Sequence, residues 1–236
     1  DAEGNLIASH KHDLGLGYKK RNWTLLANAF DHSMIRNAIS YHICKEVGLP
    51  FAAGYRFIDL VINDEYRGTY QVSDHLEVDK KRINIDEDTG WYVEFQGRRD
   101  MLDYPNIQST GYLMNVKNPD TDGLTEEETT SLLNVIKDWF DNKWKPSLDG
   151  FIVDASDVDE GWRAYNDEQT LMDFLIATDI TGDYDGLMTV KAYRDLDTKL
   201  FWGPVWDKDL AIGNYDNSND EKLVMEIEPN KCPVIN

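Results

Sequence analysis

The chain has 236 residues, of which 41% are hydrophobic, and its 24 basic and 44 acidic residues give a formal net charge of −20. This hydrophobic content can bury a sizeable core, and no Pro/Gly/Ser-rich linker divides the chain, so we expect one domain over residues 1–236. No apolar run reaches the roughly 20 residues that span a bilayer. The negative charge repels nucleic acid and attracts basic protein, so composition argues against nucleic-acid binding and a membrane span.

The first predicted element is a helix over residues 33–48, with Asp31 or Ser33 as the N-cap and Gly48 as the stop. Cys44 lies within it and is predicted to be a buried free thiol. The expected buried face comprises Met34, Ile35, Ala38, Ile39, Ile43 and Val47.

A hairpin is predicted next, because residues 56–62 and 66–73 alternate apolar with polar side chains around the turn sequence Asn63-Asp64-Glu65. Residues 91–95 and 111–117 add two strands. The first half of the chain is therefore expected to form a mainly antiparallel sheet carrying one helix.

The segment after residue 117 is similar to the opening of a calcium loop, with oxygen-bearing residues at alternate positions and Gly123 in sixth place. Position twelve is Thr129 instead of Glu, and Thr125 with Glu128 matches a capping box. We therefore predict a helix cap, for a helix that carries Leu132, Leu133, Ile136, Trp139 and Phe140.

A second amphipathic helix is predicted over residues 168–180. An acidic cluster, Asp183-Tyr184-Asp185, follows it, and residues 189–201 form a hairpin candidate with Asp195-Leu196-Asp197-Thr198 as its turn. This hairpin would fold the chain back on the acidic cluster. The helix residues expected to be buried are Leu171, Met172, Phe174, Leu175, Ile176 and Ile180.

Asp207 and Asp209 stand one residue apart, just after the second strand of this hairpin. Pro204 cannot donate to a sheet ladder, so the two carboxylates are expected at a strand end. Mg²⁺ takes oxygen ligands and often uses one or two carboxylates, with substrate phosphate completing its shell. The pair therefore predicts a divalent metal site, and the alternative is that Asp209 caps a helix starting at Leu210.

The order of helix, acidic loop, hairpin and strand-end aspartate is similar to the catalytic half of a protein kinase. There, one aspartate accepts the substrate hydroxyl proton and a later one holds Mg²⁺, and Asp185 and Asp207 would fill those positions. The five histidines form no zinc motif, and no nucleophile elbow or phosphate loop is present. A glycosidase remains an alternative function, because paired acids such as Asp185 and Asp207 could serve its chemistry and the seven tryptophans could stack on sugars.

Several motifs, taken in their order, carry a resemblance to a known family. They are Asn22-Trp-Thr-Leu-Leu-Ala-Asn28, Asp31-His-Ser-Met-Ile-Arg-Asn37, Phe57-Ile-Asp-Leu-Val-Ile-Asn63, Tyr66-Arg-Gly-Thr-Tyr70, residues 78–85, Val116-Lys-Asn-Pro119, Asp183-Tyr-Asp185 and residues 203–214. With them the chain resembles, over most of its length, the CotH-type spore-coat protein kinases and their secreted relatives. The resemblance implies an α+β, atypical kinase-like fold with lobes near 1–117 and 118–236.

The same resemblance implies transfer of the γ-phosphoryl group of ATP, with Mg²⁺ or Mn²⁺, to Ser or Thr of a protein substrate. Asp185 would be the general base or hydroxyl-orienting residue, and Asp207 with Asp209 would bind the metal. Lys117 and Arg36 match family motifs and are candidates for contacts with the nucleotide phosphates. Lys117 could instead guard a strand edge against aggregation, and Arg36 could brace a neighbouring carboxylate. The resemblance and the acidic charge together favour a basic, Ser/Thr-rich protein substrate, and the resemblance favours a secreted or surface location.

Some positions depart from the family pattern. Lys208 stands where the family usually has an aromatic residue, and it could pair with phosphate or oppose the metal. Asp183 stands at a position where Asn is frequent, and Asp74 stands where Glu is expected. We also expect a nucleotide-covering segment before Asn22 and helices after residue 216, and find neither. Lys208 and the missing segment favour the alternative function, a catalytically silent binding module, adhesin or scaffold, on the kinase fold.

Overall fold

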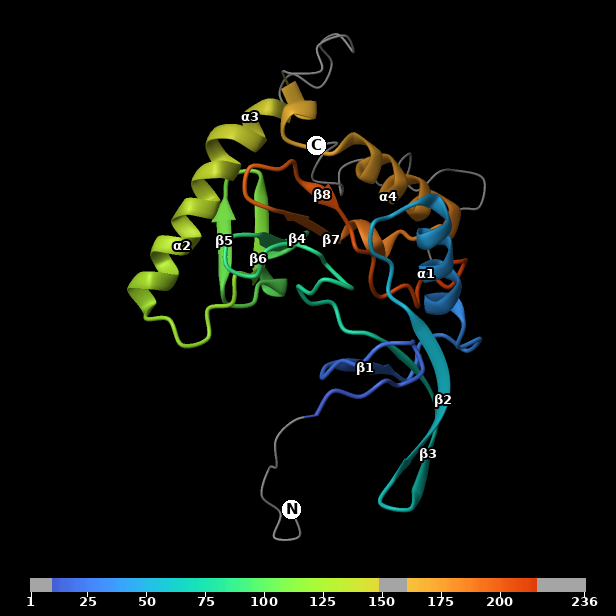
Figure 1. The fold of residues 1–236 in the computed structure, drawn as a ribbon. Coiled ribbons are helices and arrows are strands. Elements are labelled where there is room, and N and C mark those ends of the chain that lie inside the picture. The colour runs from blue at the N-terminus through green and yellow to red at the C-terminus, as the bar shows by residue number, and fades with distance from the viewer. Residues whose placement is uncertain (1–9, 149–160, 216–236) are drawn as a thin grey trace.

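The computed structural model describes residues 10–148 and 161–215, which form two antiparallel sheets and their helices (Figure 1). The three-stranded sheet has the order β1-β3-β2, with β1 at Trp23–Leu26, β2 at Tyr55–Ile62 and β3 at Glu65–Asp74. The five-stranded sheet has the order β5-β6-β4-β7-β8, with β4 at Trp91–Gln96, β5 at Asn106–Ser109, β6 at Tyr112–Asn118, β7 at Thr189–Arg194 and β8 at Phe201–Trp202. This mixture of helices and antiparallel sheets confirms the α+β class.

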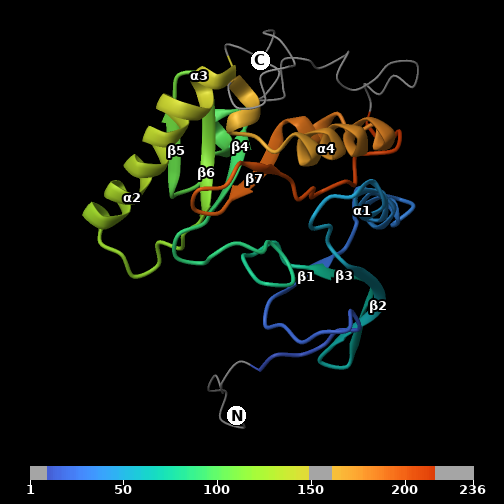
Figure 2. The same cartoon turned by 45° about the horizontal axis from the view of Figure 1, so that its top comes forward.

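The helices lie on opposite sides of the five-stranded sheet (Figure 2). Helix α2 runs along the β5 side, whereas α4 lies along β8 and packs against α1. Their bounds are α1 Arg36–Val47, α2 Glu126–Trp139, α3 Lys145–Leu148 and α4 Glu168–Thr181, with a π-helical turn at Phe140–Trp144 and 3₁₀ turns at Arg99–Met101, Gly161–Ala164 and Asp185–Leu187.

Two predicted hairpins and one predicted cap are confirmed. In the β2–β3 turn, Asn63 and Asp64 take positive φ angles of 52° and 63°, the conformation that a tight hairpin turn needs. Strands β7 and β8 form the second hairpin. Thr125 and Glu128 make the capping box of α2, in which each side chain accepts a backbone N–H of the other residue.

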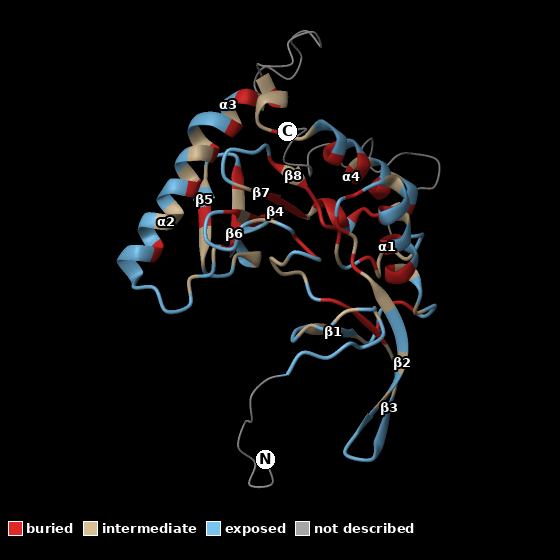
Figure 3. Ribbon diagram, viewed as in Figure 1, coloured by how far each residue is buried: buried red, intermediate tan, exposed pale blue. Residues whose placement is uncertain are grey.

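An aromatic cluster forms the centre of the core, on the face of the five-stranded sheet. The ring of Phe95 lies 5.4 Å from that of Trp144 and 5.8 Å from that of Trp202, and all three side chains are buried. Both indole N–H groups donate to the buried Asn166 Oδ1, at 3.0 and 3.2 Å. Figure 3 shows this burial around the second sheet, whereas β2 and the start of β3 are largely exposed.

The predicted buried face of α1 is wrong in part. The helix begins at Arg36 without a side-chain cap, and Ile35 and Ile39 are 44% and 39% exposed. A more polar face is buried instead, comprising Asn37, Ala38, Ser40, Tyr41 and Cys44, because this face meets α4 and the chain around Trp206. The thiol of Cys44 is buried and unpaired with another cysteine, as predicted.

Helix α4 departs from prediction in the same way. Leu171 and Phe174 are buried, but Met172, Ile176 and Ile180 are 47%, 42% and 60% exposed. Short polar residues fill the buried side, since Thr170, Thr178 and Thr181 bond back to carbonyl oxygens of the preceding turn. The helix therefore buries a mixed face, which its apolar residues alone do not reveal.

The sheets divide the chain between β3 and β4. Strands β4 and β6 pair with each other, and β4 also pairs with β7, so the second sheet joins segments from both sides of residue 117. The two lobes near 1–117 and 118–236 stay a prediction. Across the helices of the described ranges, none combines the length and apolar character that crossing a bilayer requires.

Candidate functional site

The turn after α4 and the chain after β8 carry the three predicted aspartates. Gly182 ends α4 in a left-handed conformation, with φ 57°, and the exposed Asp185 then opens the 3₁₀ turn Asp185–Leu187. After β8 the chain passes through Gly203 and Pro204, and Asp207 takes a φ of 58°. Within the described residues up to 215 no helix starts at Leu210, so Asp209 is not a helix cap.

Asp207 lies within electrostatic reach of both Asp185 and Asp209. The pKa of Asp207 is raised, first by desolvation of its carboxylate and then by the charges of Asp209 and Asp185, whereas the ammonium of Lys191 opposes the shift. A cation bound beside Asp207 would offset the repulsion between these like charges. The acidic chemistry of this cluster therefore suits a hard divalent ion.

The cluster is not a complete metal cage. Over the part of the chain that the structure describes, no three or more His, Cys, Asp or Glu side chains are grouped closely enough to hold a metal. Mg²⁺ commonly keeps several waters and binds through one or two carboxylates plus substrate phosphates. Asp207 and Asp209 fit that open type of site.

A pocket of about 380 Å³ is lined by Lys117, Lys191 and Trp206, and Trp206 directly precedes Asp207 in the chain. Lys191, which sequence reasoning missed, lies opposite Glu94 in the β4–β7 register, and its Nζ is 2.8 Å from Glu94 Oε1. Lys117 Nζ is 3.3 Å from Glu94 Oε2. The Lys191 side chain is 8% exposed and that of Lys117 37%, so Lys191 is the deeper of the two cations.

Glu94 joins the two lysines electrostatically. Burial would raise the pKa of this carboxyl, but the neighbouring ammonium groups, first Lys191 and then Lys117, hold it below its usual range. The carboxylate is therefore charged at neutral pH and fixes both cations at one wall of the pocket. The remaining lining residues include Tyr92 and Trp206, which supply aromatic surface.

Arg36 lies outside this lining. Its Nη1 pairs with the carboxylate of Asp31 and donates to Ser33 Oγ at 3.0 Å, while its Nε lies 3.4 Å from the carbonyl oxygen of Ile212. This arrangement corresponds to the bracing alternative, in which Arg36 holds a neighbouring carboxylate. Its contact with a nucleotide stays a prediction.

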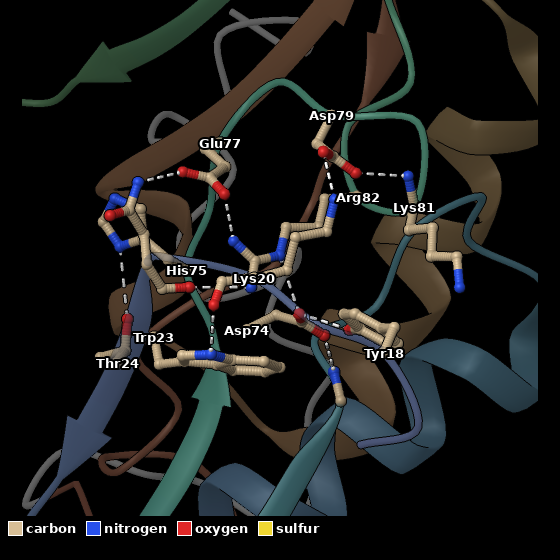
Figure 4. Close-up of polar contacts among 12 residues, drawn as sticks. Tyr18, Lys20, Trp23, Thr24, Asp74, His75, Glu77, Asp79, Lys81 and Arg82 are labelled. Carbon is tan, nitrogen blue, oxygen red and sulfur yellow. Dashed lines mark hydrogen bonds and ion pairs between the residues drawn. The ribbon is translucent and has the colours of Figure 1, made fainter. Parts of the chain in front are cut away.

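Asp74 has a full set of partners despite its shorter side chain. Its carboxylate accepts hydrogen bonds from Gly54 N at 2.9 Å, from Arg82 Nε at 2.8 Å and from the hydroxyl of Tyr18 (Figure 4). The next residue, His75, lies with its Nδ1 3.4 Å from Thr24 Oγ1, and both of these residues line the pocket. The Asp74 network therefore supports the chain beside the pocket.

The two unusual residues Lys208 and Asp183 contact each other. The Lys208 ammonium pairs with the Asp183 carboxylate, and the two side chains are only 3% and 0% exposed. Burial lowers the pKa of Lys208 to about 8, so the ammonium remains charged at pH 7. Its charge is compensated by Asp183 and faces the interior, so it is neither available to phosphate nor an unpaired cation beside the metal position.

Comparison with known proteins places the chain in a family. Residues 7–234 match the family model described as CotH kinase protein. A search of curated proteins returned no match. Because the family match covers nearly the whole chain, the protein belongs to the CotH kinase family.

Proposed function

We propose that this protein is a magnesium-dependent kinase that transfers the γ-phosphoryl group of ATP to Ser or Thr of a protein substrate. The observation that carries the proposal is that the lysines lining one pocket lie close to a carboxylate that could bind a metal ion. Lys117 and Lys191, which both pair with Glu94, line the pocket, and the carboxylate of Asp207 lies within electrostatic reach of Lys191. Phosphoryl transfer needs such positioned cations and metal ligands more than covalent chemistry.

Lys191 is the best-placed residue to bind the phosphates. Its ammonium is fixed by Glu94 and lies close enough to Asp207 to counter the rise in that residue's pKa. A phosphate bridging Lys191 and a metal on Asp207 would satisfy both charges. Lys117, more exposed, is suited to an auxiliary phosphate contact at the pocket mouth.

The acidic residues take the remaining roles. Asp207 and Asp209 would hold Mg²⁺, which when bound neutralises charge on the phosphates. Asp185 is exposed at the start of its 3₁₀ turn, and it would orient a substrate hydroxyl and accept its proton. Because Asp185 is in the same electrostatic cluster as Asp207, the hydroxyl and the metal would meet on one side of the pocket.

The pocket also has space for the rest of a nucleotide. A second pocket of about 790 Å³ shares His75, Leu76, Tyr92 and Lys117 with the first and extends along Pro119 and Leu132. Ligand pockets of roughly 300–1,000 Å³ commonly combine apolar walls with a few fixed polar groups. Tyr92 and Leu76 provide such apolar wall for a base or ribose.

Calorimetric titration of ATP with and without Mg²⁺ tests this assignment. We expect Mg²⁺ to tighten ATP binding at least about tenfold, equal to ~1.4 kcal/mol. AMP lacks the β- and γ-phosphates that reach the metal, so its weaker binding should not depend on Mg²⁺. Binding of neither nucleotide would favour the alternative, a silent binding module on the same fold.

A further inference from the structure

A continuous set of buried polar contacts connects the first sheet to the candidate site. Ser73 Oγ accepts a hydrogen bond from Gln71 Nε2 at 2.9 Å, and Gln71 Oε1 accepts one from Asn28 Nδ2 at 3.3 Å. Asn28 Oδ1 in turn accepts a hydrogen bond from Asn37 Nδ2 at 3.0 Å. All four side chains are at most 7% exposed, so the contacts are shielded from water.

Asn37, on α1, links these contacts to the segment that carries Asp207 and Asp209. Its Oδ1 accepts the backbone N–H of Lys208 at 2.6 Å. The Lys208 backbone is thereby fixed between Asp207 and Asp209, while its side chain turns inward to Asp183. Lys208 is therefore buried, whereas its two neighbours are more accessible to solvent: Asp207 is exposed and Asp209 is half-buried.

Asp183 completes the connection at the other acidic segment. Its Oδ2 pairs with the Lys208 ammonium and its Oδ1 accepts the backbone N–H of Gly186 at 3.0 Å, one residue beyond Asp185. A Cβ at position 186 would lie 1.9 Å from Asp183 Oδ2 and 2.5 Å from Lys208 Nζ. Only glycine therefore allows the turn of Asp185 to approach the ion pair this closely.

We propose that Lys208, Asp183 and Asn37 are positioning residues, which set the spacing between Asp185 and the Asp207–Asp209 pair. The inference rests on the proposed function for its consequence, but the geometric linkage is independent of it. One ion pair joins the two segments that carry the candidate hydroxyl-orienting and metal-binding residues. Because both partners are buried, the pair has little freedom to exchange its partner for water.

Hydrogen exchange of the nucleotide-free protein tests the linkage without any activity. In Lys208→Met, we expect amide exchange to accelerate about tenfold in both 183–187 and 207–214, since the two segments lose the ion pair that joins them. Asp141→Asn is the matched control, because it removes the ion pair with Lys137 on the far side of the second sheet and should leave both segments unchanged. Acceleration confined to 207–214 would overturn the proposal.

A comparison with the double variant distinguishes loss of the ion pair from the effect of leaving one buried charge without its partner. Asp183→Asn retains an oxygen for the Gly186 N–H and is the milder variant if Lys208→Met fails to fold. Asp183→Asn with Lys208→Met should exchange no faster than the faster single variant, since members of one pair are not additive. Additive acceleration would contradict a shared role.

Nucleotide affinity then shows whether the linkage serves the site. ATP with Mg²⁺ should bind Lys208→Met about tenfold more weakly, whereas ATP in chelator should bind it as it binds the unaltered chain. Equal loss in both conditions would indicate general damage and overturn a positioning role. If the unaltered chain binds no ATP, the proposed function fails, while the exchange experiment still decides the linkage.

Discussion

Asp207→Asn is expected to abolish the magnesium-dependent part of ATP binding while raising the melting temperature of the nucleotide-free protein. Asp207 is exposed as a residue, but its carboxylate is partly desolvated and lies near the charges of Asp209 and Asp185, and both effects raise its pKa. A carboxyl with a raised pKa in the folded state favours the protonated form, so its stability contribution falls as pH rises above the ordinary value of 3.8. At pH 7 the neutral amide removes that penalty, but it also removes a metal ligand.

The change is chosen to preserve the backbone. Asp207 has a φ of 58°, a left-handed conformation that Asn adopts readily. Asp64→Asn is the matched control, because Asp64 has a φ of 63° in the exposed β2–β3 turn and should leave both melting temperature and nucleotide affinity nearly unchanged. Calorimetry and thermal unfolding measure the two effects, and retained magnesium dependence in Asp207→Asn would exclude it as a metal ligand.

Lys191→Met is expected to weaken magnesium–ATP binding much more than Lys117→Met. Charge-assisted hydrogen bonds in a buried setting contribute roughly 1.5–3 kcal/mol, or about 10- to 150-fold in affinity. Exposed ion pairs contribute roughly 0.2–1 kcal/mol, less than about sixfold. The two lysines share the partner Glu94, so the comparison isolates their depth in the pocket.

Affinities of the two variants should be measured after circular dichroism confirms that each is folded. Among the residues that the structure describes, Lys191→Met leaves Glu94 with Lys117 as its one ion-pair partner, so a lower melting temperature is expected for this variant. A larger affinity loss in Lys117→Met would instead assign the phosphate contact to the lysine that the sequence motif indicated.

Local signals in the sequence predicted most of the elements. The turn residues at 63–64, the capping box at Thr125 and the turn at 195–198 each depend on neighbours in sequence, and each is confirmed. The family resemblance rested on such short motifs in order, and the family match extends over residues 7–234. The acidic residues of the candidate site belonged to these motifs.

Tertiary partners were not predictable in the same way. Lys191 sits in the strand Thr-Val-Lys-Ala-Tyr-Arg, and only the β4–β7 register shows that Glu94 lies opposite. A lysine inside an otherwise buried strand was the available signal, since such a charge requires a partner. Likewise, Asp183 and Lys208 each stood out singly, 25 residues apart, and nothing local indicated that they form one ion pair.

The apolar faces of α1 and α4 were mispredicted for a related reason. A helix was assumed to bury its aliphatic residues, yet α1 buries Asn37 and Tyr41 towards the segment that carries Asp207. The contacts that order the candidate site therefore replace part of the usual hydrophobic face. Sequence periodicity cannot distinguish this arrangement from ordinary helix packing.

Transfer of labelled γ-phosphate to a basic test protein is the most direct measure of the central claim. We predict magnesium-dependent incorporation into Ser or Thr by the unaltered chain, reduced at least about a hundredfold in Asp185→Asn. ATP affinity should be retained in that variant, because Asp185 would act on the hydroxyl. Incorporation that is equal in Asp185→Asn, or absent from the unaltered chain although it binds magnesium–ATP, would contradict the account.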